Sequence, residues 1–225
     1  MRGGGGLQQL FAERIALRYD NGGMDRSEEM RVTVRTETKK GVNRRQEILD
    51  AAAQCFAKSG YDATSMRDIA KHTDLLAGSL YYHFKSKEEL LCAVHEEGVR
   101  RIKEKVLLAI NPQADAWTRL EQASVAYLES MLTQSIYAQV VVSELPRRRP
   151  LKLRNILVAH RDDFEDIFRR IVDELPLRPD IDRKYWRLSL MGMLAWTFVW
   201  YRLGRDSPAD VARRLVDLLR HQTEA

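Results

Sequence analysis

The segment from Thr64 to Lys87 constrains the fold of this chain most, because it has the pattern of two short helices joined by a tight turn. Ser65 and Asp68 have the spacing of a capping box, in which each side chain binds the backbone N–H of the other residue, so they predict the start of the first helix. Asp74 follows that helix and can adopt the left-handed backbone that a sharp turn often needs. The segment therefore predicts a helix-turn-helix.

The second helix of this pair is predicted over Ala77–Phe84. Leu80 and Phe84 lie four residues apart, so they face inward together, while the small Ala77 and Gly78 let the start of the helix approach a duplex closely. Helix-turn-helix proteins place this part of the second helix against base edges in the major groove. We therefore expect a sequence-specific DNA-binding protein. The alternative, a core helix with aromatic packing, explains LYYHF alone but not the capped helix and turn before it.

The segment from Arg44 to Leu91 resembles the TetR family of bacterial transcription regulators. NRRQEILDAAAQCFAKSGYDATSMRDIAKHT is similar to the first two helices of that family, and GSLYYHFKSKEELL to its recognition helix and the start of the next helix. The resemblance implies that contacts to bases and grooves come from Ala77, Gly78, Ser79 and Tyr81. It implies contacts to the DNA backbone from Thr64, Tyr82, His83 and Lys87, and we add Ser65, Arg44 and Arg45 to the candidate DNA-binding residues.

The chain departs from the family pattern at two positions of this region. Asp74 replaces the common glycine of the turn, and Leu76 replaces the small hydroxyl residue that usually caps the recognition helix. Loss of that cap removes a hydrogen bond worth about 1 kcal/mol. The arrangement around Leu76 is similar to a subgroup that controls fatty-acid, sterol or acyl-CoA catabolism.

The charge of the chain is placed to favour an anionic partner. The sequence has 225 residues and a net charge of +5, from 37 Lys plus Arg against 32 Asp plus Glu. This excess is modest, but the arm between Arg31 and Arg45 is strongly basic and contains a single acid, Glu37. Such an arm adds contacts to DNA phosphates. The alternative for the arm is a solvated, disordered tail.

We divide the chain into three regions. Residues 1–42 are predicted to be a flexible extension with the basic arm, residues 43–88 the helix-turn-helix domain, and residues 89–225 a helical ligand-binding and dimerisation domain. Asn43 is the predicted cap of the first ordered helix, which ends at Gly60. The remaining pattern predicts no strand. It predicts a helix that Ser86 caps, followed by helices over 117–133, 136–145, 151–175, 183–201 and 208–221. The fold class is therefore all-α.

The last two predicted helices, Arg183–Tyr201 and Pro208–His221, are apolar enough to need a partner. The resemblance implies that they form a homodimer interface, and a two-fold dimer suits a palindromic operator with recognition helices about 34 Å apart. The alternative is that both helices only close the core of one chain. The uncharged run Leu188–Tyr201 is too short to span a bilayer and is predicted to form a fully buried helix, so we expect no membrane partner.

The resemblance also implies a small-molecule effector that releases a repressor from DNA. Pockets between helices of bundles are apolar with a few placed polar groups, although aromatic residues at helical spacing are often only core. His160, Arg161 and Arg202 are candidate polar groups, and the basic cluster between Arg147 and Arg154 suits a phosphorylated ligand such as a coenzyme A ester or is a solvated loop. The candidate ligand-binding residues are Trp117, Tyr127, Met131, Tyr137, His160, Phe164, Trp196 and Trp200.

Other functional classes find little support in the sequence. His160, Asp162 and Asp163 are the best residues for a hydrolase, but no nucleophile motif or metal-ligand spacing accompanies them, so we expect no enzyme, cofactor or metal. Neither of the two cysteines belongs to a CxxC pair, and no secretory signal is evident, which favours the cytoplasm. The main alternative to a ligand-released repressor is a DNA-bound adaptor whose C-terminal domain recruits a protein.

Overall fold

The computed structural model describes residues 28–73, 76–132, 135–144, 149–202 and 204–223. In these residues the chain forms helices and no β-strand, which confirms the all-α class. The helices are α2 (Glu28–Ser59), α3 (Met66–Lys71), α4 (Ala77–His83), α5 (Lys87–Ala109), α6 (Ala116–Leu132), α7 (Ile136–Glu144), α8 (Leu151–Asp173), α9 (Arg183–Trp200) and α10 (Pro208–Thr223).

The predicted start of the first helix at Asn43 is wrong, because α2 begins at Glu28 and runs through Asn43. The sequence between these residues contains no proline and only one glycine, so nothing interrupts the i→i−4 hydrogen bonds. The end of the helix is as predicted, since Gly60 follows it with a φ of +78°. Residues 44–225 form one compact unit. The predicted flexible extension over 1–42 stays a prediction, and residues 1–27 lie outside the described residues.

The helix-turn-helix is built on a small apolar core. Phe56 of α2, Ile69 of α3 and Leu80 and Phe84 of α4 are all buried in one cluster. The capping box is confirmed, since the Ser65 hydroxyl accepts from the backbone N–H of Asp68 and the Asp68 carboxylate accepts from that of Ser65. No side chain caps α4, because Leu76 stands at its N-cap. Asp74 lies outside the described residues.

Helix α5 belongs to both halves of the compact unit. Ser86 caps it as predicted, and the helix ends before Asn111-Pro112. Its early residues Leu91 and Val94 lie in the core of the helix-turn-helix, while Ile102 and Val106 lie in the core of the C-terminal helices. One continuous helix therefore connects the DNA-reading elements to the rest of the unit.

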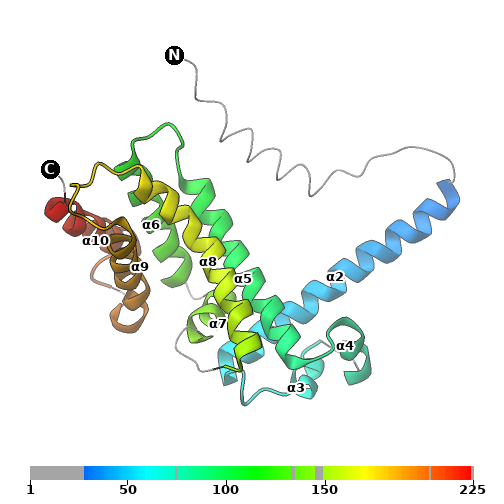
Figure 1. Cartoon of the computed structure of the whole chain (residues 1–225). Coiled ribbons are helices and arrows are strands. Elements are labelled where there is room, and N and C mark those ends of the chain that lie inside the picture. The colour runs from blue at the N-terminus through cyan, green and yellow to red at the C-terminus, as the bar shows by residue number, and fades with distance from the viewer. Residues whose placement is uncertain (1–27, 74–75, 133–134, 145–148, 203, 224–225) are drawn as a thin grey trace. The chain divides into compact units, whose positions relative to one another are not determined.

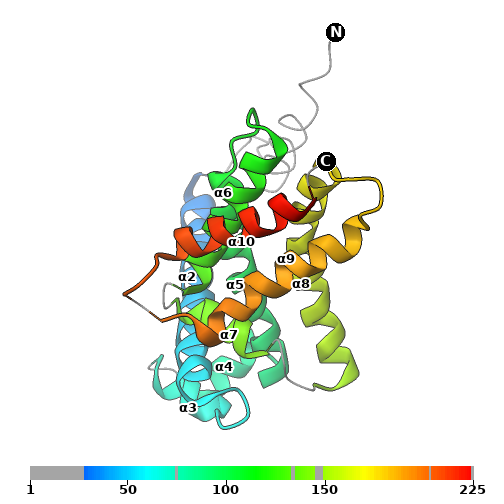
Figure 2. The ribbon, with the colours of Figure 1, turned by 90° about the vertical axis from the view of Figure 1, so that its left-hand side faces the viewer.

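The C-terminal helices surround α5. Helices α6, α7 and α8 pack against it, and α10 lies across α6. The predicted capping box of α10 is confirmed, because the Ser207 hydroxyl accepts from the backbone N–H of Asp210 and the Asp210 carboxylate accepts from that of Ser207. Figures 1 and 2 show α3 and α4 at one end of the compact unit, away from α10.

The prediction that Leu188–Tyr201 is fully buried is wrong for the single chain. Leu190 and Leu194 of α9 are buried, but the opposite face carries exposed Trp196 and Trp200. The reason is that α9 packs on the unit with one face only, and no other element of the described chain covers the second.

Candidate DNA interface and effector cavity

Helix α4 presents its polar and aromatic side chains to solvent. The exposed fraction of Tyr82 is 87%, that of Tyr81 is 51%, and Ser79 is exposed beside them. A Cβ added at Gly78 would meet nothing within 4 Å, so the backbone at the start of α4 is open to a close approach. The side chain of Ala77 lies outside the described residues. The exposed surface of α4 therefore consists of the residues that the sequence assigned to DNA.

Two other predicted DNA-binding residues have structural roles. The Thr64 hydroxyl is buried and donates to the carbonyl oxygen of Gly60 at 2.8 Å. The Lys87 ammonium donates to the carbonyl oxygens of Tyr61 and Thr64, at 3.0 and 2.9 Å. The two Lys87 contacts join residues more than twenty positions apart in the sequence, and they hold the turn between α2 and α3 against the start of α5.

The remaining candidates lie around the same end of the unit. Arg44 is exposed and pairs with Glu47 at 2.7 Å. The guanidinium carbon of Arg45 lies 5.1 Å from the centroid of the Phe84 ring, which places a cation beside the end of α4. The Ser65 hydroxyl donates to Asp68 at 2.6 Å, and the His83 ring meets that of Tyr82 edge-on.

A cavity of about 540 Å³ opens among α5, α6, α7, α8 and α9. Most of its wall is apolar, and charged groups cluster on the side of α7 and α8. Its lining residues are His95, Val99, Ile102, Tyr127, Met131, Val141, Glu144, Arg149, Arg154, Leu157, Val158, Arg161, Phe164, Glu165, Leu188, Met191, Gly192 and Ala195.

Three of the eight predicted ligand-binding residues line this cavity, namely Tyr127, Met131 and Phe164. The rings of Tyr127 and Phe164 stack with their centroids 5.4 Å apart. The predicted polar residue Arg161 and the basic-cluster residues Arg149 and Arg154 line it too. Arg147 and Arg148 lie outside the described residues.

The other predicted ligand-binding residues lie elsewhere. Trp117 is buried against Trp186 in the C-terminal core, with ring centroids 5.8 Å apart. Trp196 and Trp200 point away from the unit on the exposed face of α9. Tyr137 faces α2, as described below, and Arg202 is absent from the cavity lining.

The arginines of the cavity differ in their partners. Arg149 pairs with the buried Glu144 through two hydrogen bonds of 2.7 and 2.9 Å, and it also binds Asp62 at 2.7 Å. Arg161 lies 3.0 Å from Asp162 and 3.4 Å from Glu165. Arg154 makes no ion pair with any residue that the structure describes. Arg154 is thus the cation of the wall that is most available to a ligand.

One lining residue of the cavity, His95, pairs with His160, a predicted ligand-binding residue that does not itself line the cavity. Nδ1 of His95 on α5 lies 3.2 Å from Nδ1 of His160 on α8, and His95 is only 3% exposed. Burial, with a smaller contribution from the neighbouring His160, lowers the pKa of His95 to about 4. Burial also lowers the pKa of His160. Sequence reasoning missed His95, although its position on the stripe with Leu91 and Ile102 is a signal that it faces inward.

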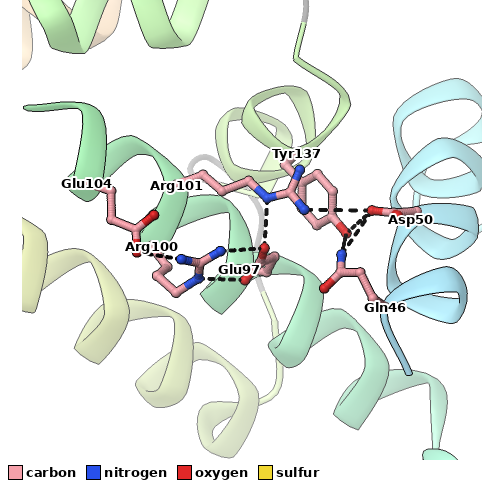
Figure 3. A network of polar contacts seen from close by, with 7 residues as sticks. All are labelled: Gln46, Asp50, Glu97, Arg100, Arg101, Glu104 and Tyr137. Carbon is pink, nitrogen blue, oxygen red and sulfur yellow. Dashed lines mark hydrogen bonds and ion pairs between the residues drawn. The ribbon is translucent and has the colours of Figure 1, made fainter. Parts of the chain in front are cut away.

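Polar contacts connect the C-terminal helices to α2, as Figure 3 shows. The Tyr137 hydroxyl on α7 donates to Asp50 of α2 at 2.7 Å, and the Gln46 amide donates to both residues, at 3.0 and 3.1 Å. The guanidinium carbon of Arg101 lies 4.1 Å from the Tyr137 ring centroid, and its Nε donates to Glu97. Arg149 makes a second connection, because its partner Asp62 lies between α2 and α3.

Among the described residues, no group of three or more His, Cys, Asp or Glu side chains is placed to hold a metal ion. No described helix combines the length and the apolar character needed to cross a membrane.

Comparison with known proteins gives two family matches. Residues 48–94 match the model described as bacterial regulatory proteins, tetR family, and residues 113–223 match the tetracyclin repressor-like C-terminal domain. The chain is 30% identical over 182 residues to the transcriptional repressor KstR2 of Rhodococcus jostii, covering 78% of this chain and 89% of that protein. It is 25% identical over 191 residues to the repressor AcnR of Corynebacterium diphtheriae, with the same two coverages.

Solved structures share the fold. A tetR-family regulatory protein from Rhodococcus RHA1 matches with a TM-score of 0.68 and 27% identity, over 81% of this chain and 97% of that one. The structure of AibR with isovaleryl coenzyme A and operator DNA matches with a TM-score of 0.67 and 24% identity, over 78% and 97%. The chain belongs to the tetR family of DNA-binding transcription regulators. The curated relatives named above are transcription regulators and not enzymes.

Proposed function

We propose, with membership of the tetR family as the premise, that this chain is a repressor that binds a palindromic operator as a homodimer and is released by a small-molecule effector. The observation that carries the proposal is the presence of an exposed reading helix and a cavity in one compact unit, joined by α5. The curated relatives KstR2 and AcnR are named repressors, which supports repression as the mode.

The reading surface is the exposed side of α4. Ser79 and Tyr81 are assigned to base edges, and Tyr82 and His83 to the sugar-phosphate backbone. Thr64 and Lys87 act indirectly, because their polar atoms hold the turn before α3. Arg44 and Arg45 add phosphate contacts, so we expect affinity to fall steeply with salt.

The dimer interface is assigned to α9 and α10. The uncovered face of α9 includes Trp196, Val199 and Trp200, and α10 adds the half-exposed Leu218. An exposed apolar surface of this kind is typical of a protein interface. A two-fold axis through these helices would leave α4 of each copy free to meet one half of a palindrome.

The cavity supports an effector with an apolar body and an anionic group. Its volume of about 540 Å³ is in the range of small-molecule sites. Tyr127, Met131 and Phe164 provide apolar contact, while Arg154 and Arg161 provide positive charge at the wall. An acyl-coenzyme A ester combines both properties, so we assign this class to the effector.

Release requires a route from the cavity to α4. Val141 of α7 lines the cavity and also packs on Gly98 of α5, where an added Cβ would lie 2.7 Å from the Val141 Cγ2. One turn earlier, Tyr137 holds Asp50 of α2. An effector that moves α7 and α5 therefore changes the support of the helix-turn-helix. It needs to prefer the released state by only a few kcal/mol.

Operator binding tests the DNA-binding half of this proposal. The purified protein is titrated onto DNA from its own upstream region by fluorescence anisotropy over a salt series. Tight, sequence-selective binding as two copies per site, weakened at least tenfold by Tyr82→Ala, is the expected result. Leu108→Ala is the matched control, because Leu108 is also 87% exposed but lies on α5 beyond the helix-turn-helix. Binding that ignores sequence, or equal loss in both variants, would contradict the proposal.

The alternative function is a DNA-bound adaptor whose C-terminal domain binds a protein. The cavity counts against it, since an adaptor needs no hollow among its helices. An adaptor would keep its operator affinity at every effector concentration.

A further inference from the structure

Arg149 belongs both to the wall of the cavity and to the support of the helix-turn-helix. It lies just before the start of α8, and its side chain is only 9% exposed. Its Nη1 donates to Asp62 at 2.7 Å, and its guanidinium carbon lies 4.5 Å from the centroid of the Tyr61 ring. Both of these residues lie between α2 and α3. One buried cation therefore reaches from the cavity to the turn that precedes α3.

The same turn is also held by Lys87, whose ammonium donates to the carbonyl oxygens of Tyr61 and Thr64. Lys87 is not among the lining residues of the cavity, whereas Arg149 is. A ligand in the cavity can therefore compete for Arg149 while the Lys87 contacts stay in place.

The two carboxylates bound to Arg149 differ in their exposure. Glu144 is bound through Nε and Nη2, at 2.7 and 2.9 Å, and its side chain is 2% exposed. The side chain of Asp62 is 61% exposed. Separating Glu144 from the cation would strand a buried charge, which is costly, but Asp62 can turn into water at little cost. Asp62 is therefore the partner that an incoming anion can displace.

The guanidinium of Arg149 offers one further edge to an anion. Glu144 takes the edge formed by Nε and Nη2, so a second bidentate anion must bind the edge formed by Nη1 and Nη2. Asp62 already binds Nη1, so the two negative charges would lie side by side and repel each other. Arg154 also lines the cavity and offers a second cation to the same ligand.

We propose that a phosphate group of the effector binds Arg149 beside Glu144 and displaces Asp62, so that the turn before α3 loses its contact to Arg149 when the cavity is filled. The inference rests on the proposed function, since it names the residue that recognises the anionic group of the same effector. Phosphate and Asp62 then exclude each other. Removal of the Asp62 charge should strengthen binding of the phosphate and weaken its influence on the operator complex.

Asp62→Asn tests this competition, because Asp62 is exposed and its substitution should leave the fold intact. Calorimetry without DNA measures the affinities for octanoyl-coenzyme A and for 1-octanol, which has an eight-carbon chain but no phosphate. We expect the variant to bind the ester about three- to tenfold more tightly than wild type does. Its affinity for 1-octanol should equal that of wild type.

Asp163→Asn is the matched control. Asp163 is 69% exposed and pairs with Lys103 at 2.6 Å, but this ion pair joins α8 to α5, and neither residue lines the cavity. The control should bind both probes as wild type does.

Operator binding gives a second readout. Anisotropy measures the operator dissociation constant with and without saturating ester, and the ratio of the two constants cancels any direct effect of the lost charge on DNA. We expect this ratio to be at least threefold smaller in Asp62→Asn than in wild type, and unchanged in Asp163→Asn. An aspartate that only stabilised the turn would not lower the affinity for the ester, so its loss would not raise that affinity.

Several results would overturn the proposal. They are an ester affinity that does not rise in Asp62→Asn, an equal rise in Asp163→Asn or for 1-octanol, an unchanged operator ratio, and no binding of the ester to wild type. Wild type that is released from its operator by the ester but shows none of these differences remains a ligand-released repressor. Wild type that fails to bind its operator contradicts the proposed function itself.

Discussion

The reading surface and the cavity are built in opposite ways. The exposed surface of α4 comes from consecutive residues between Leu76 and His83, on one short helix. The cavity takes its wall from five helices, between His95 and Ala195. The first is therefore encoded locally, and single substitutions at exposed positions should change function with little effect on stability. The second depends on the packing of the whole unit, so its residues affect folding and function together.

The largest expected effect breaks the core beneath the reading surface. Leu80→Ala removes a fully buried side chain from α4 and should lower the free energy of unfolding by about 2–5 kcal/mol. Denaturant unfolding followed by circular dichroism measures the change. The exposed control Leu108→Ala should stay within about 0.5 kcal/mol of wild type. Equal stability of the two variants would show that α4 does not pack as described.

Acid should destabilise the cavity side of the comparison. His95 has a pKa of about 4 in the folded chain against an ordinary value of 6.5, so the unfolded chain binds protons first as pH falls. The contribution of neutral His95 to the free energy of unfolding is therefore fully present above about pH 6.5. It is lost as the pH falls towards 4, which lowers the free energy of unfolding by on the order of 3 kcal/mol. Urea unfolding across this range should show the loss, and His95→Phe should reduce it. A pH profile identical in the variant would contradict the burial of His95.

The junction between the two regions is sensitive to one methyl group. In Gly98→Ala the new Cβ would lie 2.7 Å from the Val141 Cγ2 and 3.1 Å from the Tyr137 carbonyl oxygen, so we expect a loss of about 1–3 kcal/mol. Thermal unfolding measures it. Gly192→Ala is the matched control, because a Cβ there meets nothing within 4 Å, and its stability should be unchanged or higher. A neutral Gly98→Ala would mean that α5 and α7 are further apart.

The smallest expected effect concerns the polar connection between α7 and α2. Tyr137→Phe keeps the ring under Arg101 but removes the hydroxyl that binds Asp50 and Gln46. We expect a loss of about 1 kcal/mol in unfolding free energy and a weaker effector response at unchanged effector affinity. Anisotropy with operator DNA and calorimetry with the effector separate the two. An unchanged response would remove Tyr137 from the route of release.

The difference between the two regions also explains which features could be predicted from the sequence. Ser65, Asp68, Leu80 and Phe84 act through neighbours three or four positions away, so their spacing was enough. Thr64 was different, because its hydroxyl is buried and donates to the carbonyl oxygen of Gly60, and its place after the end of α2 does not show which way the hydroxyl points. For α2, Asn43 was predicted to be the N-terminal cap. No proline lies between Glu28 and Asn43, so the helix begins earlier and continues through Asn43.

The cavity was predictable only in part. Tyr127, Met131 and Phe164 line it as expected, but Trp117, Trp196 and Trp200 have the same aromatic character and lie elsewhere. Helical spacing shows which residues share a face, but not whether that face meets the core, a cavity or a second copy. The polar residues were harder still, since the pairing of His95 with His160 joins two helices distant in the sequence.

The central claim is that occupancy of the cavity controls the reading surface. The most direct measurement is the operator dissociation constant in rising concentrations of octanoyl-coenzyme A, for wild type and for Arg154→Ala. We predict that the ester raises the wild-type constant at least tenfold, and that Arg154→Ala needs a higher concentration for the same rise. An operator dissociation constant that stays the same at every concentration of the ester, while Tyr82→Ala still weakens operator binding, would contradict the claim and favour the adaptor function.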